Sequence, residues 1–414
     1  MSSRLSRRDL LRLATVLLTV PAACRTRDPD VVEWWTIQLS PTFDEYMRTM
    51  IATFEARHPG VKIAWTDVPF DAVGSRLVTA ALAGRLPAVM NLNADIVAAM
   101  ALAGRLVDLG AAAPEVVKTF LPSALASCTV AGAVSAFPWY LATDILLWRE
   151  DLFREAGIDR PPTTFAELPG VCDALVRATK RVAMAPKIGT DSDFLEYCAM
   201  EGASVFDGKK VDLSDPRCAA LAGLFVDLVA ARAIPRGALT ASHRFGLDVF
   251  ARGESAMLLS GPQFLRIVEE NDPKVASRVR TAPPVLGAAG VGNLSAMNIA
   301  VAADAPRRDV AVAFAAHVAS ATWQLELCRR AAVFPSAIEA LRDPFFTEGT
   351  GSLGEARRTA VKALASARTL IIGLPRKEEA QRRVMGALQA MAFGGKPAAE
   401  ALVEAAAGIN ARIG

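Results

Sequence analysis

The stretch "RLVTAALAGRLPAVMNLNAD", residues 76–95, decides how this chain folds. Its first half has the composition of a helix that ends at Gly84, and Pro87 then introduces the apolar run "AVMNLN" (88–93). That run predicts a buried strand, and a further helix is predicted over 95–103. A helix that leads into a buried strand and then into another helix is typical of a parallel sheet.

The residues before this stretch repeat the alternation. "VVEWWTIQ" (31–38) and "VKIAWTDVP" (61–69) predict two further strands, and an amphipathic helix that starts at Ser40-Pro41 lies between them. A helix over 71–84 joins the second strand to the third. Units of this length indicate an α/β fold, in which helices cover both faces of a parallel sheet.

Polar residues follow two of these strands. Thr36 and Gln38 lie at the end of the first strand, and Asn93 and Asp95 follow the third. Ligands on parallel sheets sit beyond the carboxyl ends of the strands, so we expect these four side chains to converge.

A second set of alternating elements follows a proline-rich break at 160–164. The pattern predicts helices over 165–180, 194–201 and 215–232, and strands over 182–189 and 255–259. A strand over 291–305 and one long helix over 307–331 come next, and the remainder is mainly helical.

The bulk composition indicates a folded chain of two domains. A chain of 414 residues exceeds one ordinary core, and 52% of its residues are hydrophobic. Its 46 basic and 43 acidic residues are scattered, so a nucleic-acid partner is not expected. Beyond the N-terminus there is no uninterrupted run of about 18 apolar residues, which argues against a polytopic membrane protein.

The first 24 residues read as a signal peptide. A basic head precedes a short apolar stretch over 13–20, and "SRRDLLR" (6–12) resembles the twin-arginine export motif. Ala22-Ala23-Cys24 resembles the end of a bacterial lipobox, in which Cys24 is lipidated, although Pro21 departs from that pattern. We therefore expect an exported protein, periplasmic or at the cell surface. Anchoring through Cys24 and soluble release remain alternatives.

The other cysteines show no CxxC spacing and lie in apolar surroundings, which predicts buried thiols. Their odd number excludes complete internal pairing, and one disulfide, for example Cys198 with Cys218, stays open. The five are Cys128, Cys172, Cys198, Cys218 and Cys328.

No motif for catalysis is found. The three histidines lack a partner at metal-ligand spacing, and the chain has no nucleophile elbow and no phosphate-binding loop that opens a helix. We expect no metal and no cofactor. Carboxylates such as Asp144, Asp191 and Asp193 leave a glycosidase pair open, but a chain of this kind is expected to bind rather than to catalyse.

Five segments, in this order along the chain, resemble one family. They are "FEARHPGVKIAWTDVPF" (54–70), the opening stretch (76–95), "FPWYLATDILLWREDLFREAGIDRPPTTFAEL" (137–168), "FARGESAMLLSGPQF" (250–264) and "VAFAAHVASATWQLELCRRAAVFPSAIEAL" (312–341). Together they resemble the bacterial extracellular solute-binding proteins of family 1, the maltose-binding-protein-like components of sugar importers.

The resemblance implies a type II periplasmic-binding-protein fold, with two α/β lobes joined by a hinge and a ligand cleft between them. Its crossovers fall near 140–145, 284–287 and 333–336. The implied N-terminal lobe is 30–141 plus 287–333, and the implied C-terminal lobe is 145–284 plus 336–414.

The resemblance also implies site residues, because aromatic rings pack on sugar faces while carboxylates and amides bind the hydroxyls. Besides the strand-end residues, the implied positions are Trp139, Tyr140, Asp144, Asp191, Ser192, Asp193, Gln263, Phe264 and Arg376. Alternatives are that Trp139 and Tyr140 fill the core and that Asp95 only caps its helix. Gln263 and Phe264 stand where the family often has tryptophan, a departure from maltodextrin-like stacking.

The expected function is capture of a sugar, an oligosaccharide or a polyol glycoside by a monomer, and its delivery to the permease subunits of an ABC importer. Two alternatives stay open: an exported glycoside hydrolase, and a two-lobed sensor whose partner is a receptor.

Overall fold

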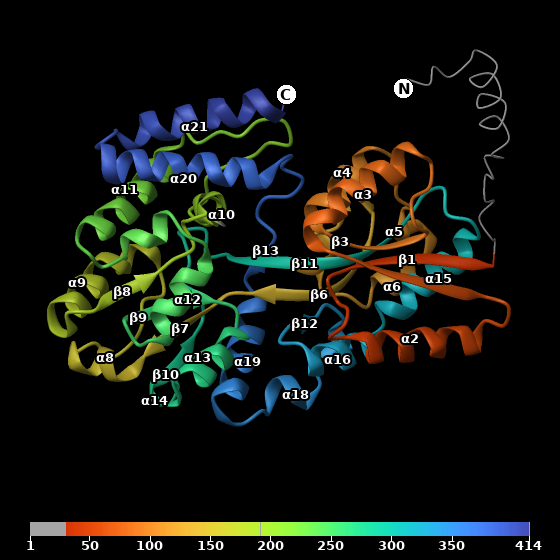
Figure 1. The fold of residues 1–414 in the computed structure, drawn as a ribbon, viewed down its shortest axis with the longest axis horizontal. Coiled ribbons are helices and arrows are strands. Elements are labelled where there is room, and N and C mark those ends of the chain that lie inside the picture. Colours follow the sequence, from red (N-terminus) through yellow and green to blue (C-terminus); the bar gives the residue numbers. More distant parts are fainter. Residues whose placement is uncertain (1–29, 191, 414) are drawn as a thin grey trace, which may run out of the picture.

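A computed structural model describes residues 30–190 and 192–413. The expected signal peptide, the lipidated Cys24 and the site residue Asp191 lie outside the described residues. Figure 1 shows two lobes side by side, each built around its own sheet, with the first three strands in one lobe and α20 and α21 in the other.

The N-terminal lobe contains a mixed sheet of seven strands, in the order β12-β6-β11-β3-β1-β2, with β13 paired to β11. β1 is parallel to both β2 and β3, as predicted, whereas β11 runs antiparallel to β3 and β6. The strands are β1 (Val31–Ile37), β2 (Lys62–Val68), β3 (Val89–Asn93), β6 (Phe137–Thr143), β11 (Gly292–Val301), β12 (Phe334–Pro335) and β13 (Ala367–Arg368). A separate hairpin pairs β4 (Thr129–Val130) with β5 (Ala133–Val134).

Helices cover both faces of this sheet because its central strands are apolar on both sides. On one face, Trp34 packs edge-on against Phe314 with 5.1 Å between the ring centroids, and Phe54 also packs against the Phe314 ring. On the other face Trp35 joins the core under α3 and α4. The helices are α2 (Asp44–Arg57), α3 (Phe70–Leu82), α4 (Ala94–Leu102), α5 (Leu109–Ala112), α6 (Pro114–Val117), α7 (Pro122–Ala126), α15 (Arg308–Val318) and α16 (Ala321–Arg330).

The C-terminal lobe has a sheet of four strands in the order β10-β7-β9-β8. Its strands are β7 (Ile145–Arg149), β8 (Val182–Ala185), β9 (Ser255–Ser260) and β10 (Val279–Ala282). All six residues of β9 are buried, which explains the apolar "AMLL" run. The covering helices include α8 (Glu150–Glu155), α9 (Leu168–Thr179), α10 (Phe194–Met200), α11 (Pro216–Ala230), α12 (His243–Ala251), α13 (Phe264–Asn271) and α14 (Pro273–Ala276).

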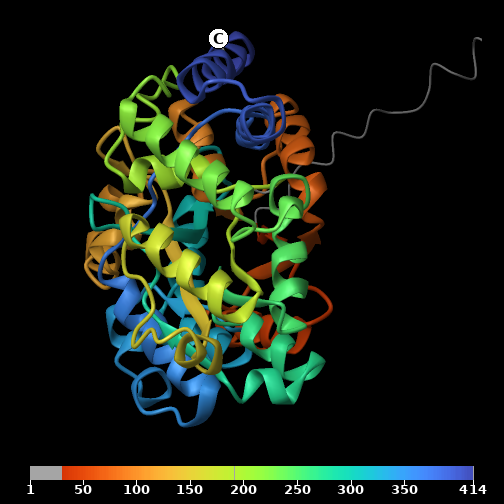
Figure 2. The same ribbon diagram turned by 90° about the vertical axis from the view of Figure 1, so that its left-hand side faces the viewer.

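The chain returns to this lobe at its end. Side chains of α20 (Lys377–Gly394) and α21 (Ala398–Ile413) pack into the same core as α9, α10 and α11. Figure 2, which looks onto this lobe, shows α20 and α21 together at its upper end. The start of α20 is thereby fixed beside α10, a placement on which the site depends.

Several segments connect the lobes. Only Asp144 separates β6 from β7, so the chain passes directly from one sheet to the other. A third core lies under this junction and combines Leu141, Leu147 and Leu294 with Ala360. Ala360 belongs to α19 (Gly351–Leu364), which follows α17 (Ile338–Leu341) and α18 (Pro344–Thr347) in the chain. Figure 1 shows α18 and α19 below the connection between the lobes.

One predicted element is wrong: the helix expected over 307–331 is two helices, α15 and α16. The chain leaves helical geometry at Ser320, whose backbone is extended. The buried side chain of Gln324 compensates for the interruption, because its Nε2 donates to the Ala319 carbonyl at 2.8 Å and its Oε1 accepts from the Ser336 amide at 2.7 Å. A buried amide that satisfies several backbone groups stabilises such a break.

The five cysteines expected to be buried thiols are buried and free, which confirms that prediction. The disulfide left open between Cys198 and Cys218 is not formed. Of the helices in the described ranges, none is long and apolar enough to cross a membrane.

Candidate functional site

The ends of β1 and β2 form a cavity of about 790 Å³, here called the outer cavity. It is lined by Gln38, Ser40, Trp65, Asp67, Pro69 and Phe70. The chain turns sharply after β1, where Gln38 has a φ of 52°. The Asp67 carboxylate holds this turn, because it accepts the Leu39 amide at 3.0 Å and the Ser40 amide at 3.1 Å.

The aromatic side chains of the outer cavity are fixed by neighbouring hydroxyl and backbone groups. Trp65 Nε1 donates to Thr36 Oγ1 at 2.8 Å, and that hydroxyl donates to Asp67 at 2.6 Å. The indole is therefore held at its edge while the residue lines the cavity, and Phe70 is 53% exposed beside it. Aromatic surface next to an amide and a carboxylate is the chemistry that recognises a ring with polar substituents.

A second cavity of about 210 Å³, here called the inner cavity, lies between the lobes. Residues of both lobes line it: Asn93, Ala94, Asp95, Asp193, Glu196, Asn293, Leu294, Ser295, Ala296, Thr369, Leu370, Ile371, Lys377 and Gln381. Asp95 comes from the start of α4, Glu196 from α10 and Lys377 from the start of α20. Three residues predicted from the sequence, Asn93, Asp95 and Asp193, thus meet at one place.

Two lysines organise the charges around the inner cavity. Lys377 Nζ lies 2.8 Å from Glu196 Oε1 and 3.6 Å from Asp95 Oδ2, and so bridges the two lobes. Lys187 Nζ lies 2.9 Å from Asp144 and 3.5 Å from Asp193. Each ammonium group is therefore shared between two carboxylates.

A glycine completes the contact of Asp95. The Gly373 amide donates to Asp95 Oδ1 at 2.9 Å, from a backbone with a φ of 73°. A Cβ at this position would also lie 3.1 Å from the Ala98 side chain. Only glycine suits both this conformation and this spacing, and the segment before α20 can therefore approach α4.

Burial and crowding shift the pKa values of these groups. Burial raises the pKa of Asp193, and the neighbouring carboxylates of Glu196 and Asp144 raise it further, against the opposing effect of Lys187. Burial alone would lower the pKa of Lys377, but Glu196 and Asp95 outweigh it and raise that pKa. The site therefore resists carrying all of its negative charges at once.

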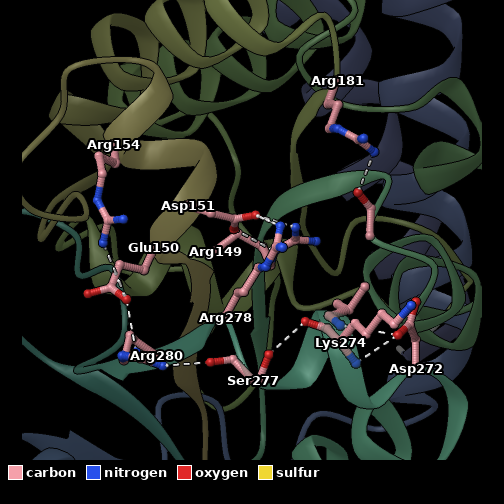
Figure 3. A network of polar contacts seen from close by, with 12 residues as sticks. Arg149, Glu150, Asp151, Arg154, Arg181, Asp272, Lys274, Ser277, Arg278 and Arg280 are labelled. Atoms are coloured by element: carbon pink, nitrogen blue, oxygen red, sulfur yellow. Dashed lines mark hydrogen bonds and ion pairs between the residues drawn. The ribbon is translucent and has the colours of Figure 1, made fainter.

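A network of charged residues on the C-terminal lobe, drawn in Figure 3, has the opposite charge balance to the inner cavity. Asp151 accepts two hydrogen bonds from Arg149, at 2.8 and 2.7 Å, and one from Arg278 at 3.0 Å. Glu150 lies 2.9 Å from Arg280. Burial raises the pKa of Asp151, but the hydrogen bonds from its arginines lower it to about 2. Here arginines outnumber the carboxylates, and the network ties α8 to β10.

Other predicted residues lie away from both cavities. Trp139 is fully buried between Trp34 and Tyr140 in the N-terminal core, and Thr36 is buried beneath Trp65 and Asp67. Tyr140 is half-buried, and it lines neither cavity.

The remaining predicted side chains have local partners. Ser192 Oγ accepts the Phe194 amide at the start of α10, and Phe264 packs edge-on against His243. Gln263 is exposed at the start of α13. Arg376 is exposed as well, and its guanidinium group lies 3.7 Å from the Glu379 carboxylate. Asn93, rather than Asp95, is the N-cap of α4, and its side chain accepts a hydrogen bond from the Ile96 amide.

The sequence reasoning missed Trp65, Asp67 and Phe70 in the outer cavity, and Glu196 and Lys377 in the inner one. Asp67 and Phe70 were within reach, since they flank the end of β2 as Gln38 follows the end of β1, whereas Trp65 lies in the middle of β2. Among the described residues, no group of three or more His, Cys, Asp or Glu side chains is placed to hold a metal ion.

Comparison with known proteins identifies similar chains. The profile of the family described as bacterial extracellular solute-binding protein matches residues 40–325. A crystal structure from Synechococcus sp. MITs9220, of a periplasmic-binding protein whose name assigns it to oligosaccharides, is 29% identical, with a TM-score of 0.82 over 92% of this chain and 98% of that one. The sugar-binding protein MalE of Xanthomonas citri is 19% identical, with a TM-score of 0.78 over 92% and 97% of the two chains.

Curated relatives are more distant. An uncharacterized lipoprotein of Streptomyces antibioticus is 24% identical over 358 residues, 81% of this chain and 78% of that protein. Four further relatives are 23% identical, and the chain spans between 49% and 66% of their length.

Proposed function

The chain belongs to the bacterial extracellular solute-binding protein family, and on that basis we propose that it captures a sugar, an oligosaccharide or a polyol glycoside outside the cytoplasmic membrane and delivers it to the permease subunits of an ABC importer. The two-lobed α/β architecture is the type II periplasmic-binding-protein fold. The name of the Synechococcus neighbour, which assigns it to oligosaccharides, supports a carbohydrate ligand.

The observation that carries the proposal is the position of the two cavities. Both lie where β1, β2 and β3 end, and the inner one takes its lining from both lobes. A ligand held there contacts two bodies that share a few connecting segments, which is the arrangement required for hinge closure around a small molecule.

The chemistry of the outer cavity favours a carbohydrate. Trp65 and Phe70 offer aromatic surface to the C–H face of a pyranose ring, while Gln38 and Asp67 offer polar groups to its hydroxyls. The lining of this cavity carries a single ionisable side chain, so a neutral ring is its best-matched ligand.

We propose that the ligand leaves chemically unchanged, since the family consists of binding proteins and not of enzymes. The carboxylates that suggested a glycosidase are engaged, because Asp144 and Asp193 share the ammonium group of Lys187. Neither the hydrolase nor the sensor is favoured by a specific observation.

Export is proposed through the N-terminal 24 residues, with their twin-arginine-like motif, and the mature protein is expected to act as a monomer. Lipidation of Cys24 is supported by the Streptomyces antibioticus relative, which is named as a lipoprotein. Mass spectrometry of the protein isolated from membranes tests the anchor, and a soluble mature chain that lacks acyl groups would contradict it.

The function is tested by isothermal titration of the mature chain against a panel of neutral and amino-substituted mono- to tetrasaccharides and polyol glycosides. We expect saturable binding of at least one member and its recovery unaltered by chromatography. Release of new reducing ends from the panel would contradict a binding role, and the absence of binding to every member would contradict a carbohydrate ligand.

A further inference from the structure

The inner cavity and its immediate surroundings hold more negative charge than positive. Four carboxylates share two lysines, and each lysine bridges two of them. The four carboxylates belong to Asp95, Asp144, Asp193 and Glu196. Within the described part of the chain, their ion pairs are with Lys187 and Lys377 alone, so two negative charges have no countercharge when all groups are ionised.

One oxygen in this cluster lacks a hydrogen-bond partner. Glu196 is 3% exposed and lines the inner cavity, and its Oε1 accepts from Lys377 at 2.8 Å. Its Oε2 is buried with no hydrogen-bond partner among the described residues. Buried polar atoms are nearly always paired, so this unpaired oxygen on a cavity-lining carboxylate marks a place for a donor that arrives with the ligand.

The charge balance decides which donor suits this place. A sugar hydroxyl would satisfy Oε2 but would leave the excess negative charge uncompensated. A protonated amine supplies both the donor and the countercharge, and charge-assisted hydrogen bonds are about twice as strong as neutral ones. The pKa of Asp193 is consistent with this charge balance, because burial raises it and the carboxylates of Glu196 and Asp144 raise it further.

We propose that the inner cavity binds a protonated amine of the ligand, so that the substrate class is an amino sugar. The inference rests on the proposed function, which makes the ligand a sugar. The cavity measures about 210 Å³, below the roughly 300 Å³ of ordinary ligand pockets, and therefore takes one end of the ligand. Ser295, Thr369 and Gln381 line the same cavity and offer neutral partners to the hydroxyls beside the amine.

The experiment compares sugars that differ at one substituent. Glucose, glucosamine and N-acetylglucosamine are titrated by calorimetry, together with the corresponding β-1,4-linked dimers. We expect the free amine to bind at least tenfold tighter than the neutral members of each set, as for a charge-assisted contact.

Two variants locate the preference. Glu196→Gln keeps the shape of the side chain and removes its charge, so the tenfold preference should fall to threefold or less. Asp193→Asn, at a less buried carboxylate of the same cavity, should reduce the preference in the same direction and serves if Glu196→Gln fails to fold. The control is Glu378→Gln, an exposed carboxylate one residue from Lys377, which should keep the full preference.

The outcomes separate the two proposals. Neutral sugars that bind as tightly as amino sugars would overturn the amine site and leave the proposed function standing. An amine preference that survives both cavity substitutions would also overturn the inference. Putrescine that binds more tightly than any sugar would support the amine site and overturn the sugar in the proposed function, and the absence of binding by every compound would overturn both.

Discussion

The outer and inner cavities lie along the same edge of the N-terminal sheet, but their chemistry differs. The outer cavity is wide, belongs to one lobe and is dominated by Trp65 and Phe70. The inner cavity is small, draws on both lobes and is dominated by Asp95, Glu196 and Lys377. We propose that the outer cavity supplies aromatic stacking, whereas the inner cavity supplies electrostatic recognition and joins the lobes.

The largest expected effect tests the inner cavity as a junction between the lobes. Lys377→Met removes the cation that bridges Glu196 and Asp95, and it leaves Glu196 buried with no countercharge. Loss of one partner of a buried ion pair costs about 3 kcal/mol of unfolding free energy. Urea denaturation measures this loss. The matched control is Lys118→Met, which breaks an exposed pair with Glu115 and should leave the midpoint unchanged. A loss below about 1 kcal/mol in the Lys377 variant would show that the bridge does not hold the lobes.

The next effect tests the outer cavity as the stacking surface. Trp65→Ala should weaken sugar binding by about 30-fold or more, since a lining tryptophan commonly carries about 2 kcal/mol of binding free energy. Calorimetry is the suitable readout because the substitution also removes a fluorophore. Phe393→Ala serves as a control for the loss of an aromatic side chain. Phe393 is as exposed as Phe70 of the outer cavity, but it lies at the end of α20, outside both cavities. Equal affinities of the Trp65 variant and the wild type would place the sugar elsewhere.

A smaller effect is expected on how the free energy of unfolding depends on pH, and it involves the inner cavity only. The folded state raises the pKa of Asp193 above its ordinary value of about 3.9, so it favours the protonated acid. The stability that this preference contributes is complete below the ordinary pKa and is lost as pH rises through the raised one. Asp193→Asn abolishes the titration, so its unfolding free energy relative to the wild type should be higher at pH 8 than at pH 4.

The groups that face Asp193 are Lys187 and Lys377, which lower its pKa, and Glu196 and Asp144, which raise it. Urea denaturation of the two proteins across pH 4 to 8 measures the difference. Parallel pH profiles for the Asn variant and the wild type would show that Asp193 ionises as an ordinary carboxylate, and the crowded-charge description of the inner cavity would then be wrong.

The smallest effect is expected from a residue outside both cavities. Phe264 follows the Gly-Pro turn and packs against His243, so Phe264→Ala should change sugar affinity by no more than about twofold. Calorimetry with the preferred sugar checks this. A tenfold loss of affinity would mean that the turn moves onto the ligand when the lobes close, and the ligand site would then include this turn as well as the two cavities.

The sequence predicts the residues at strand ends better than those that a distant helix brings to the site, for a physical reason. Gln38 and Asn93 were found because parallel strands place their carboxyl ends at one edge, a rule that follows from the order of strands and helices. Asp67, at the end of β2, obeys the same rule and was accessible to it. Glu196 and Lys377 were not, because their pairing arises from the packing of α20 beside α10 across a long stretch of chain.

Trp139 shows where the alternation of a strand fails as a guide. The pairing of β6 with β11 shifts register here, because Tyr140 pairs with Met297 and Pro138 with Asn298, and the rings of Trp139 and Tyr140 lie 5.1 Å apart against the same core. The structure buries Trp139 in the aromatic core with Trp34, the alternative that the sequence left open. Regular alternation along the strand would place these two neighbours on opposite faces, and the register shift, which the sequence pattern does not reveal, brings both to one core.

A crystal structure of the mature chain with its preferred sugar tests the central claim most directly. The account predicts an intact sugar between the lobes, with a ring against Trp65 and polar contacts to Asp193 or Glu196. A sugar bound at another surface, or one cleaved in the crystal, would contradict it.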